Sequence, residues 1–397
     1  MSGRATARAA FCVLEIMDPK IAFNPEISGY IRKIGSNLGD AMTQHDRVLA
    51  SSPIADHTTP LIRNAWYVAG LSHEITRDLL PRTLLDTRVV LYRKLDGGVV
   101  ALRDRCPHRS FPLSRSQLQG DRLTCRYHGL TFDEHGKCVH VPSSPETKSN
   151  IRVRSFKVVE RYPLVWIFMG DAERADPSLI PNLDWLADAN WVTVQGSYEI
   201  STNYVAMHEN LLDQTHFTFL HEGTVGTPEW AAAPLEVSVD GDVVSLRREL
   251  LRSDPPGIYA SPMRLEGKLV DRLSEAAFIG PAGHVAKARI TQRDGSAEDG
   301  REFRVNITHL FTPQTQHSIH YWWFNSRDFY LDDENASRFL HDASAKAYYE
   351  DVEALQWISD TVVNDVVAHR EFSVRADRPG LLMRQVLARL AAQEQKA

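Results

Sequence analysis

The stretch RCPHR at residues 105–109 is followed by CRYHG at residues 125–129, with sixteen residues between His108 and Cys125. Each stretch supplies one thiolate and one imidazole from a short loop. Two facing loops of this kind can hold a small metal centre between them, because zinc and iron both accept these ligands. Cys106, His108, Cys125 and His128 therefore form the first candidate site, and the fold is inferred outward from them.

Three interpretations of these four side chains compete. Chance packing of buried cysteines and histidines is disfavoured, because two close Cys/His pairs occur in one short region. A structural zinc site usually pairs Cys with Cys and His with His in its loops, whereas each loop here mixes them. A [2Fe-2S] cluster with two Cys on one iron and two His on the other suits mixed loops, because each loop sends one ligand to each iron. The pattern favours this third interpretation.

This region resembles the Rieske family, whose motif is Cys-x-His, about sixteen residues, then Cys-x-x-His. The flanking residues agree: Pro107, Arg109, the stretch YHGLTFD at 127–133, and Gly136. The resemblance implies that Cys106, His108, Cys125 and His128 hold a Rieske-type [2Fe-2S] cluster. Cys12 and Cys138 lie outside both loops, so we interpret them as ordinary thiols.

A second group of polar residues follows in the stretch ENLLDQTH at 209–216. Asn210, Asp213 and His216 recur every three residues, which predicts one face of a helix. His221 would point elsewhere on an unbroken helix, so a bend or helix end must separate it from His216, and Gly223 favours an end. The two histidines alone leave metal binding and core packing open. A redox centre upstream favours the facial triad of two His and one carboxylate that holds non-haem Fe(II).

A later helical stretch offers the carboxylate. Its three- and four-residue spacing predicts a buried stripe formed by Tyr348, Asp351, Leu355, Ile358 and Val362. Asp351 is the acid of this stripe, and a buried carboxylate needs a partner or a metal. Asp365 also falls on the stripe and is the second choice. Glu350 and Glu353 fall off it, so we expect them to be solvated.

From about residue 61 to the C-terminus, the chain resembles Rieske oxygenases with a single large subunit, in particular the vanillate O-demethylase and dicamba monooxygenase group. The stretch FSVRADRPG at 372–380 is part of this resemblance. It implies an α+β fold, with an all-β Rieske domain followed by a helix-grip catalytic domain, in which an antiparallel sheet wraps a long helix. It also implies a homotrimer. His216, His221 and Asp351 would hold a mononuclear Fe(II), and Asp213 would bridge the two metal centres, meeting His128 of a neighbouring subunit.

These observations predict a terminal oxygenase that activates O2 at the mononuclear iron and hydroxylates or O-demethylates a small aromatic substrate. Electrons would come from a ferredoxin or flavin reductase, because no Gly-x-Gly-x-x-Gly stretch is present and NAD(P)H must therefore be oxidised on a partner. Asn210 and Asp213 are the candidate catalytic residues. We expect the substrate pocket to be lined by residues 200–220, by strands around Ile290 and Ile307, and by YWWF at 321–324.

Two other functional classes remain open from the residues alone. One is a Rieske electron-transfer protein with a ligand-binding second domain and no catalytic iron. The other is a ligand-binding protein in which zinc occupies the four loop ligands. Iron content separates these classes, because only the oxygenase needs iron beyond the cluster.

Composition limits the remaining possibilities. The 397 residues suit two domains, and a net charge of −6 gives no basic excess for nucleic acid. No run approaches the roughly 20 apolar residues of a membrane span, and four cysteines are too few for a disulfide framework. We therefore expect a soluble, cytoplasmic protein. Residues 1–58 are predicted to be an extension or linker, 61–170 the Rieske domain, and 171–397 the catalytic domain.

Overall fold

The computed structural model describes residues 53–146, 150–365 and 371–395. Cys12 and nearly all of the expected extension at 1–58 lie outside the described residues. Residues next to the start of the described chain contact its far end, since the N–H of Ala55 donates to the carbonyl of Arg384 at 2.9 Å. Among the described helices, none combines the length and apolar character needed to cross a bilayer.

The first part of the described chain forms three small antiparallel sheets, with strand orders β1-β10-β9, β2-β3-β4 and β5-β6-β7-β8. Short apolar runs at 89–92 and 99–102, joined across Asp96 and two glycines, predict a hairpin. In the structure β3 does pair with β4, with Tyr92 opposite Val100. The strands are β1 (Trp66–Leu71), β2 (Leu80–Leu84), β3 (Thr87–Arg93), β4 (Val99–Arg103), β5 (Gln117–Gln119), β6 (Arg122–Thr124), β7 (Thr131–Phe132), β8 (Cys138–His140), β9 (Lys157–Arg161) and β10 (Leu164–Phe168).

The two ligand loops leave these small sheets at strand ends. The loop that begins at Cys106 follows β4, and the loop that begins at Cys125 joins β6 to β7. Both cysteines belong to one apolar core, which also contains Tyr92, Leu123 and Phe132. Packing of that core therefore fixes the base of each loop and brings the two loops together.

The second part of the chain forms one seven-stranded antiparallel sheet in the order β11-β17-β16-β15-β14-β13-β12. Side chains of β14 alternate strictly between buried and half-buried, as expected for a sheet covered on one face. The strands are β11 (Val192–Ile200), β12 (Leu235–Asp240), β13 (Val243–Ser253), β14 (Val270–Phe278), β15 (Gly283–Gln292), β16 (Glu302–Thr315) and β17 (Ser318–Arg327).

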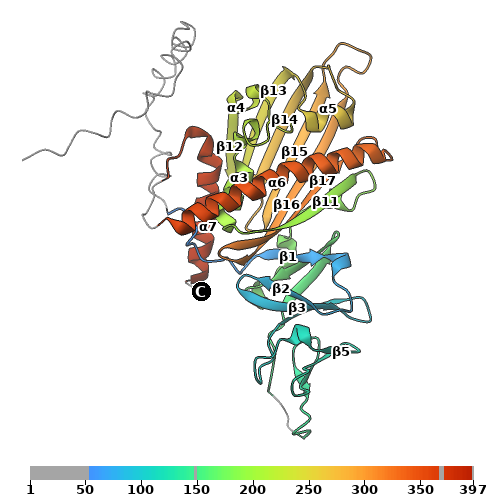
Figure 1. The fold of residues 1–397 in the computed structure, drawn as a ribbon, viewed down its shortest axis with the longest axis vertical. Helices are drawn as coiled ribbons and strands as arrows, with labels where there is room; N and C mark the ends of the chain where they lie inside the picture. The colour runs from blue at the N-terminus through green and yellow to red at the C-terminus, as the bar shows by residue number, and fades with distance from the viewer. Residues whose placement is uncertain (1–52, 147–149, 366–370, 396–397) are drawn as a thin grey trace, which may run out of the picture. The chain divides into compact units, whose positions relative to one another are not determined.

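A long helix, α6 (Glu334–Asn364), crosses one face of this sheet (Figure 1). It begins where the Asp333 side chain accepts hydrogen bonds from the N–H groups of Asn335 and Ala336, a typical N-cap. The Tyr198 hydroxyl on β11 donates to the carbonyl of Ala345 at 3.0 Å and ties the helix to the sheet. The other α-helices are α3 (Tyr204–Leu212), α4 (Pro228–Ala232), α5 (Gly257–Met263) and α7 (Arg378–Gln395). The α+β fold predicted from the sequence, small β sheets followed by a large sheet with a long helix, is confirmed.

Two local predictions are wrong. The helix predicted through His216 ends at Leu212, because Asp213 adopts an extended backbone and its carboxylate accepts the N–H of Thr215 at 2.6 Å. Asn210, Asp213 and His216 therefore do not share a helical face. The predicted buried stripe of α6 ends at Leu355, and Ile358 is 53% exposed. Beyond Leu355, none of the described residues of α6 is buried.

Candidate metal centres

The two loops of the first centre have the same backbone hydrogen bonds. In each loop the cysteine N–H donates to the carbonyl five residues later, and the cysteine carbonyl accepts from the N–H four residues later. The fourth residue after each cysteine has a positive φ, +60° at Ser110 and +76° at Gly129. The bonds run from Cys106 to Phe111 and from Ser110 to Cys106, then from Cys125 to Leu130 and from Gly129 to Cys125, at 2.8–2.9 Å. Two equivalent loops thus present equivalent ligands.

Within this pair of loops, thiols and imidazoles lie on different sides. Cys106 and Cys125 are buried, whereas His108 and His128 are exposed and their ring centroids lie 4.5 Å apart. Burial raises the pKa of the Cys106 thiol, and the Cys125 thiol beside it raises that pKa further. Two thiols on the inside and two imidazoles on the outside fit a cluster with one iron on each side.

The second centre brings together His216, His221 and Asp351, with one potential ligand atom from each residue lying within 4.8 Å of the others. Asp351 Oδ1 lies 3.5 Å from Nε2 of His216 and 3.2 Å from Nε2 of His221. Two imidazoles and a carboxylate on one side of a site are the ligand set of the non-haem Fe(II) facial triad. Asp365, the second choice from the sequence, lies at the C-terminal end of α6 and outside this group.

The end of α3 explains how both histidines reach one point. After Asp213 the chain turns into a short 3-10 helix over His216–Thr218, and His221 follows it. The carbonyl of His221 then accepts the N–H groups of Thr224 and Val225 in a tight turn. A helix end does lie between the two histidines, as expected, because the 3-10 helix stops at Thr218. The α-helix itself ends earlier, at Leu212.

Two polar residues of α3 and its C-cap contact the centre. The Asn210 amide donates to Asp351 Oδ1 at 2.9 Å, and Asp213 Oδ2 lies 3.6 Å from Nδ1 of His216. Burial raises the pKa of Asp213, but hydrogen bonds from His216 and Thr215 outweigh it and lower the pKa to about 2. Asp213 is therefore an anion at neutral pH and can accept a hydrogen bond from the His216 ring.

Glu350 was predicted to be solvated, and this is wrong. Its Oε2 lies 2.8 Å from Nδ1 of His221, and only 24% of its side chain is exposed. Helical periodicity places Glu350 off the helix face that carries Asp351. Its longer side chain nevertheless reaches Nδ1 of His221, the ring nitrogen opposite the one that faces Asp351. Its position directly before the candidate ligand Asp351 was the one signal available in the sequence.

Buried atoms at the second centre lack the partners that buried polar groups need. Among the described residues, Nε2 of His216 and Oδ1 of Asn210 are buried without a hydrogen-bond partner. Burial raises the pKa of Asp351, but hydrogen bonding with His221 and the nearby charge of His216 lower it overall. An ionised carboxylate and an unpartnered imidazole nitrogen at one point fit a bound divalent cation.

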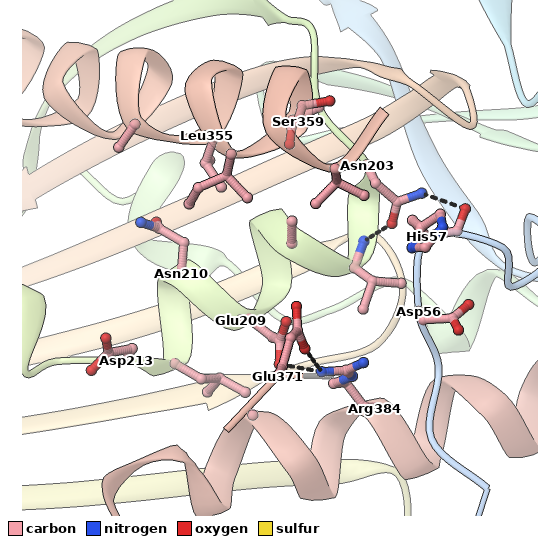
Figure 2. A pocket seen from close by; sticks show the side chains of 18 of the residues that line it. Asp56, His57, Asn203, Glu209, Asn210, Asp213, Leu355, Ser359, Glu371 and Arg384 are labelled. Atoms are coloured by element: carbon pink, nitrogen blue, oxygen red, sulfur yellow. Dashed lines mark hydrogen bonds and ion pairs between the residues drawn. The ribbon is translucent and has the colours of Figure 1, made fainter. Parts of the chain in front are cut away.

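A cavity of about 700 Å³ opens beside this centre. Asn210, Asp213 and His216 line one part of it, and Figure 2 shows Arg384 on its floor, paired with Glu209 and Glu371. Most of its lining comes from residues 202–220, the C-terminal part of α6, and residues 371–384, and Asp56, His57 and His317 complete it. Of the segments expected to line the substrate pocket, only residues 200–220 contribute to this cavity. Ile290, Tyr321 and Trp323 are buried side chains that do not line it.

Comparison with known proteins assigns the family. The Rieske [2Fe-2S] domain family matches residues 65–162, and the vanillate O-demethylase oxygenase C-terminal domain family matches residues 200–393. The oxygenase component of dicamba O-demethylase from Stenotrophomonas maltophilia is 35% identical over 81% of this chain and 93% of its own length. The chain belongs to the Rieske oxygenases. The vanillate O-demethylase oxygenase subunit of a Pseudomonas strain is 30% identical over 84% of this chain and 96% of its own length.

A solved structure agrees with this assignment. Dicamba monooxygenase with non-haem iron and dicamba superposes with a TM-score of 0.74 at 30% identity, covering 85% of this chain and 99% of the other. As a Rieske oxygenase, the chain is an oxidoreductase with a Rieske [2Fe-2S] domain and an oxygenase domain built for a mononuclear iron. The two matched regions contain all the candidate ligands. The electron-transfer and zinc-stabilised alternatives are accordingly not favoured.

Proposed function

We propose that this Rieske oxygenase is a terminal oxygenase component that uses electrons from a separate protein to hydroxylate or O-demethylate a small aromatic molecule. One observation carries the proposal: His216, His221 and Asp351 converge within 4.8 Å in a chain that also carries the paired Cys/His loops. A cluster that only relayed electrons to another protein would need no such second centre.

The residue roles follow from the geometry. Cys106, His108, Cys125 and His128 would hold the [2Fe-2S] cluster, and His216, His221 and Asp351 the mononuclear Fe(II). When bound, that iron supplies open coordination positions at which O2 is activated beside the substrate. The contacts of the neighbouring side chains support this assignment, because each ligand of the second centre has a polar neighbour that can orient it.

Three neighbouring residues would hold the ligands in place. The Asn210 amide keeps Asp351 Oδ1 directed toward the centre. Glu350 accepts from the ring nitrogen of His221 that faces away from the centre, and Asp213 lies 3.6 Å from the corresponding nitrogen of His216. A histidine whose Nδ1 proton is held in this way keeps the Nε2 lone pair available for a metal. The ligands are therefore oriented before iron binds.

Electron supply requires a partner protein. Relatives are named as oxygenase components or subunits of demethylase systems, which supports a separate reductase or ferredoxin for this chain. We further propose a homotrimer in which His128 of one subunit approaches Asp213 of the next. Exposure supports this, because the His128 side chain is exposed and the Asp213 side chain, lining the cavity, is 35% exposed.

The domain boundaries are proposed at 61–170 for the Rieske domain and 171–397 for the catalytic domain. Their support is the strand pairing: β1 to β10 pair only among themselves in the small sheets, and β11 to β17 form the large sheet. The segment between Phe168 and Val192 contains only short 3-10 turns, which suits a connection between domains.

Iron counting tests the proposed function. A reconstituted oxygenase should contain about three irons per chain, two in the cluster and one at the second centre, against about two for an electron carrier. Substrate-dependent oxygen consumption with a surrogate reductase, across a panel of methoxylated and unsubstituted aromatic acids, would then separate demethylation from hydroxylation. A reconstituted protein with two irons and no oxygen uptake would contradict the proposal.

A further inference from the structure

The two cluster loops share their backbone hydrogen bonds but differ at the residue two positions before the cysteine. In the second loop this residue is Leu123, which is fully buried in the apolar core of the small sheets. In the first loop it is Asp104, whose side chain is fully buried as well. A carboxylate therefore lies at the base of one loop, where an apolar side chain lies at the base of the other.

The carboxylate of Asp104 closes the first loop. Its Oδ1 accepts the N–H of Ser114 at 2.6 Å, and its Oδ2 accepts the Ser114 hydroxyl at 2.8 Å. Ser114 directly follows Leu113, a buried residue of the core that also contains the cluster cysteines. Asp104 and Ser114 flank the segment that carries Cys106 and His108, so these two hydrogen bonds hold the ends of that segment together.

A third contact joins Asp104 to β3. Nη2 of Arg88 lies 3.0 Å from Asp104 Oδ2, and the N–H of Asp104 donates to the carbonyl of Arg88 at 2.8 Å. Among the described residues, Arg88 is the only cation within ion-pair distance of Asp104. The Arg88 side chain is 60% exposed, whereas that of Asp104 is fully buried. Water therefore screens the positive charge of this pair much more than the negative charge.

A buried anion beside a cluster ligand makes the cluster harder to reduce. Asp104 lies two residues before Cys106, and both residues are buried, so little water lies between them to screen the charge. Reduction adds one negative charge to the cluster, and a nearby anion opposes that addition. The reduction potential of iron–sulfur clusters depends on such charges, on hydrogen bonds and on solvent exposure.

We propose that Asp104 is a positioning residue of the cluster: its buried carboxylate closes the first ligand loop, and its negative charge lowers the reduction potential of the cluster. This inference rests on the proposed function, in which the cluster supplies electrons to the second centre. A lower potential makes the reduced cluster a stronger donor of its one electron. Leu123, at the equivalent position of the second loop, has no charge and cannot act in this way.

A redox titration of the cluster-loaded protein, followed by the electron paramagnetic resonance signal of the reduced cluster at fixed pH and ionic strength, tests this role. Asp104→Asn keeps the size of the side chain and one oxygen acceptor for Ser114, but it removes the charge. We expect its reduction equilibrium to shift toward the reduced cluster by at least about tenfold, or about 59 mV for one electron.

Asp121→Asn is the matched control in the same domain. Asp121 pairs with Arg77 and its side chain is 31% exposed, so the same charge is removed from a solvated position. We expect this variant to shift the reduction equilibrium by less than about threefold, because water and salt screen surface charges.

Two further variants separate the charge from the closure of the loop. Arg88→Gln removes the compensating cation and leaves the Asp104 carboxylate, so the potential should fall rather than rise. Ser114→Ala removes a hydrogen-bond donor and no charge. We expect Ser114→Ala and Asp104→Asn both to lose the cluster at least about twofold faster than the wild-type protein in the presence of an iron chelator, measured by visible absorption.

Several outcomes would overturn the role of Asp104. A potential that falls in Asp104→Asn, or that rises no more than in Asp121→Asn, excludes the effect of the charge. If Asp104→Asn assembles no cluster, an unchanged or higher potential in Arg88→Gln excludes that effect instead. Loss of the cluster at the wild-type rate in Ser114→Ala excludes loop closure.

The spectrum of the wild-type protein separates this inference from the proposed function. A Rieske signal in the wild-type protein, with no difference in potential between Asp104→Asn and Asp121→Asn, keeps the oxygenase function and removes the role of Asp104. A reconstituted wild-type protein without a Rieske signal contradicts the cluster itself, whatever the variants do.

Discussion

Glu350 Oε2 lies 2.8 Å from Nδ1 of His221, while Oδ1 of the next residue, Asp351, lies 3.2 Å from Nε2 of the same ring. Consecutive carboxylates of α6 thus contact both nitrogens of one histidine. Asp351 is a candidate metal ligand, and Glu350 instead fixes the tautomer and direction of the imidazole. Glu350 is therefore a positioning residue in the proposed centre.

The first prediction concerns this positioning role. Glu350→Ala should weaken binding of the mononuclear metal by about 10- to 100-fold, because His221 loses the acceptor that holds its Nδ1 proton. Glu350→Gln keeps an oxygen acceptor and should recover part of the affinity. Titration of iron-depleted protein with Co(II), followed by its visible absorption, measures this directly. Glu353→Gln on the same helix is the control, and equal Co(II) affinity in Glu350→Ala would contradict the role.

The second prediction concerns the cluster. Cys106→Ser and His128→Ala should abolish the electron paramagnetic resonance signal of the reduced Rieske cluster, because hydroxyl and methyl groups cannot replace thiolate and imidazole as iron ligands. Cys138→Ser is the matched control, since Cys138 is also buried but its Sγ contacts only the carbonyl of His140, at 3.4 Å. A full signal in either loop variant would show that the ligand assignment is wrong.

The third prediction concerns the mononuclear iron. His221→Ala and Asp351→Ala should lose one iron per chain and all oxygen consumption. The cluster spectrum should persist, because the cluster loops belong to the small sheets, whereas the ligands of the second centre lie after α3 and on α6. Asp365→Ala should keep its iron, since Asp365 lies at the end of α6 outside the ligand group. Iron analysis decides the choice of carboxylate, and the reverse result would assign it to Asp365.

The fourth prediction concerns Asp213. Asp213→Asn should keep the fold, the cluster and most of the iron, yet turn over orders of magnitude more slowly, because an amide oxygen is a weaker acceptor than a carboxylate and cannot serve two imidazoles equally. Stopped-flow absorption should show normal reduction of the cluster by a reductase and slow reoxidation with substrate and O2. Reoxidation at the wild-type rate would mean that electrons reach the iron by another route.

Local sequence was enough to predict the parts of this protein whose residues are neighbours along the chain. Each cluster loop holds its cysteine and histidine within four residues, so spacing alone indicated the ligands. The hairpin of β3 and β4 was predicted from two short apolar runs joined by turn residues. Asp351 could be singled out because helical periodicity marks a carboxylate among apolar positions.

Contacts between segments far apart in the chain could be read only from the folded structure. Glu350 and His221 are 129 residues apart, and periodicity, which reports the face of a helix but not the reach of a side chain, placed Glu350 in solvent. The end of α3 at Leu212 depends on the hydrogen bond that the Asp213 carboxylate accepts from the N–H of Thr215, which competes with helical hydrogen bonding. Arg248 of β13 and Arg272 of β14 both lie over the Trp230 ring because of the register of β13 on β14. Register is set by packing of the whole sheet face rather than by either strand alone.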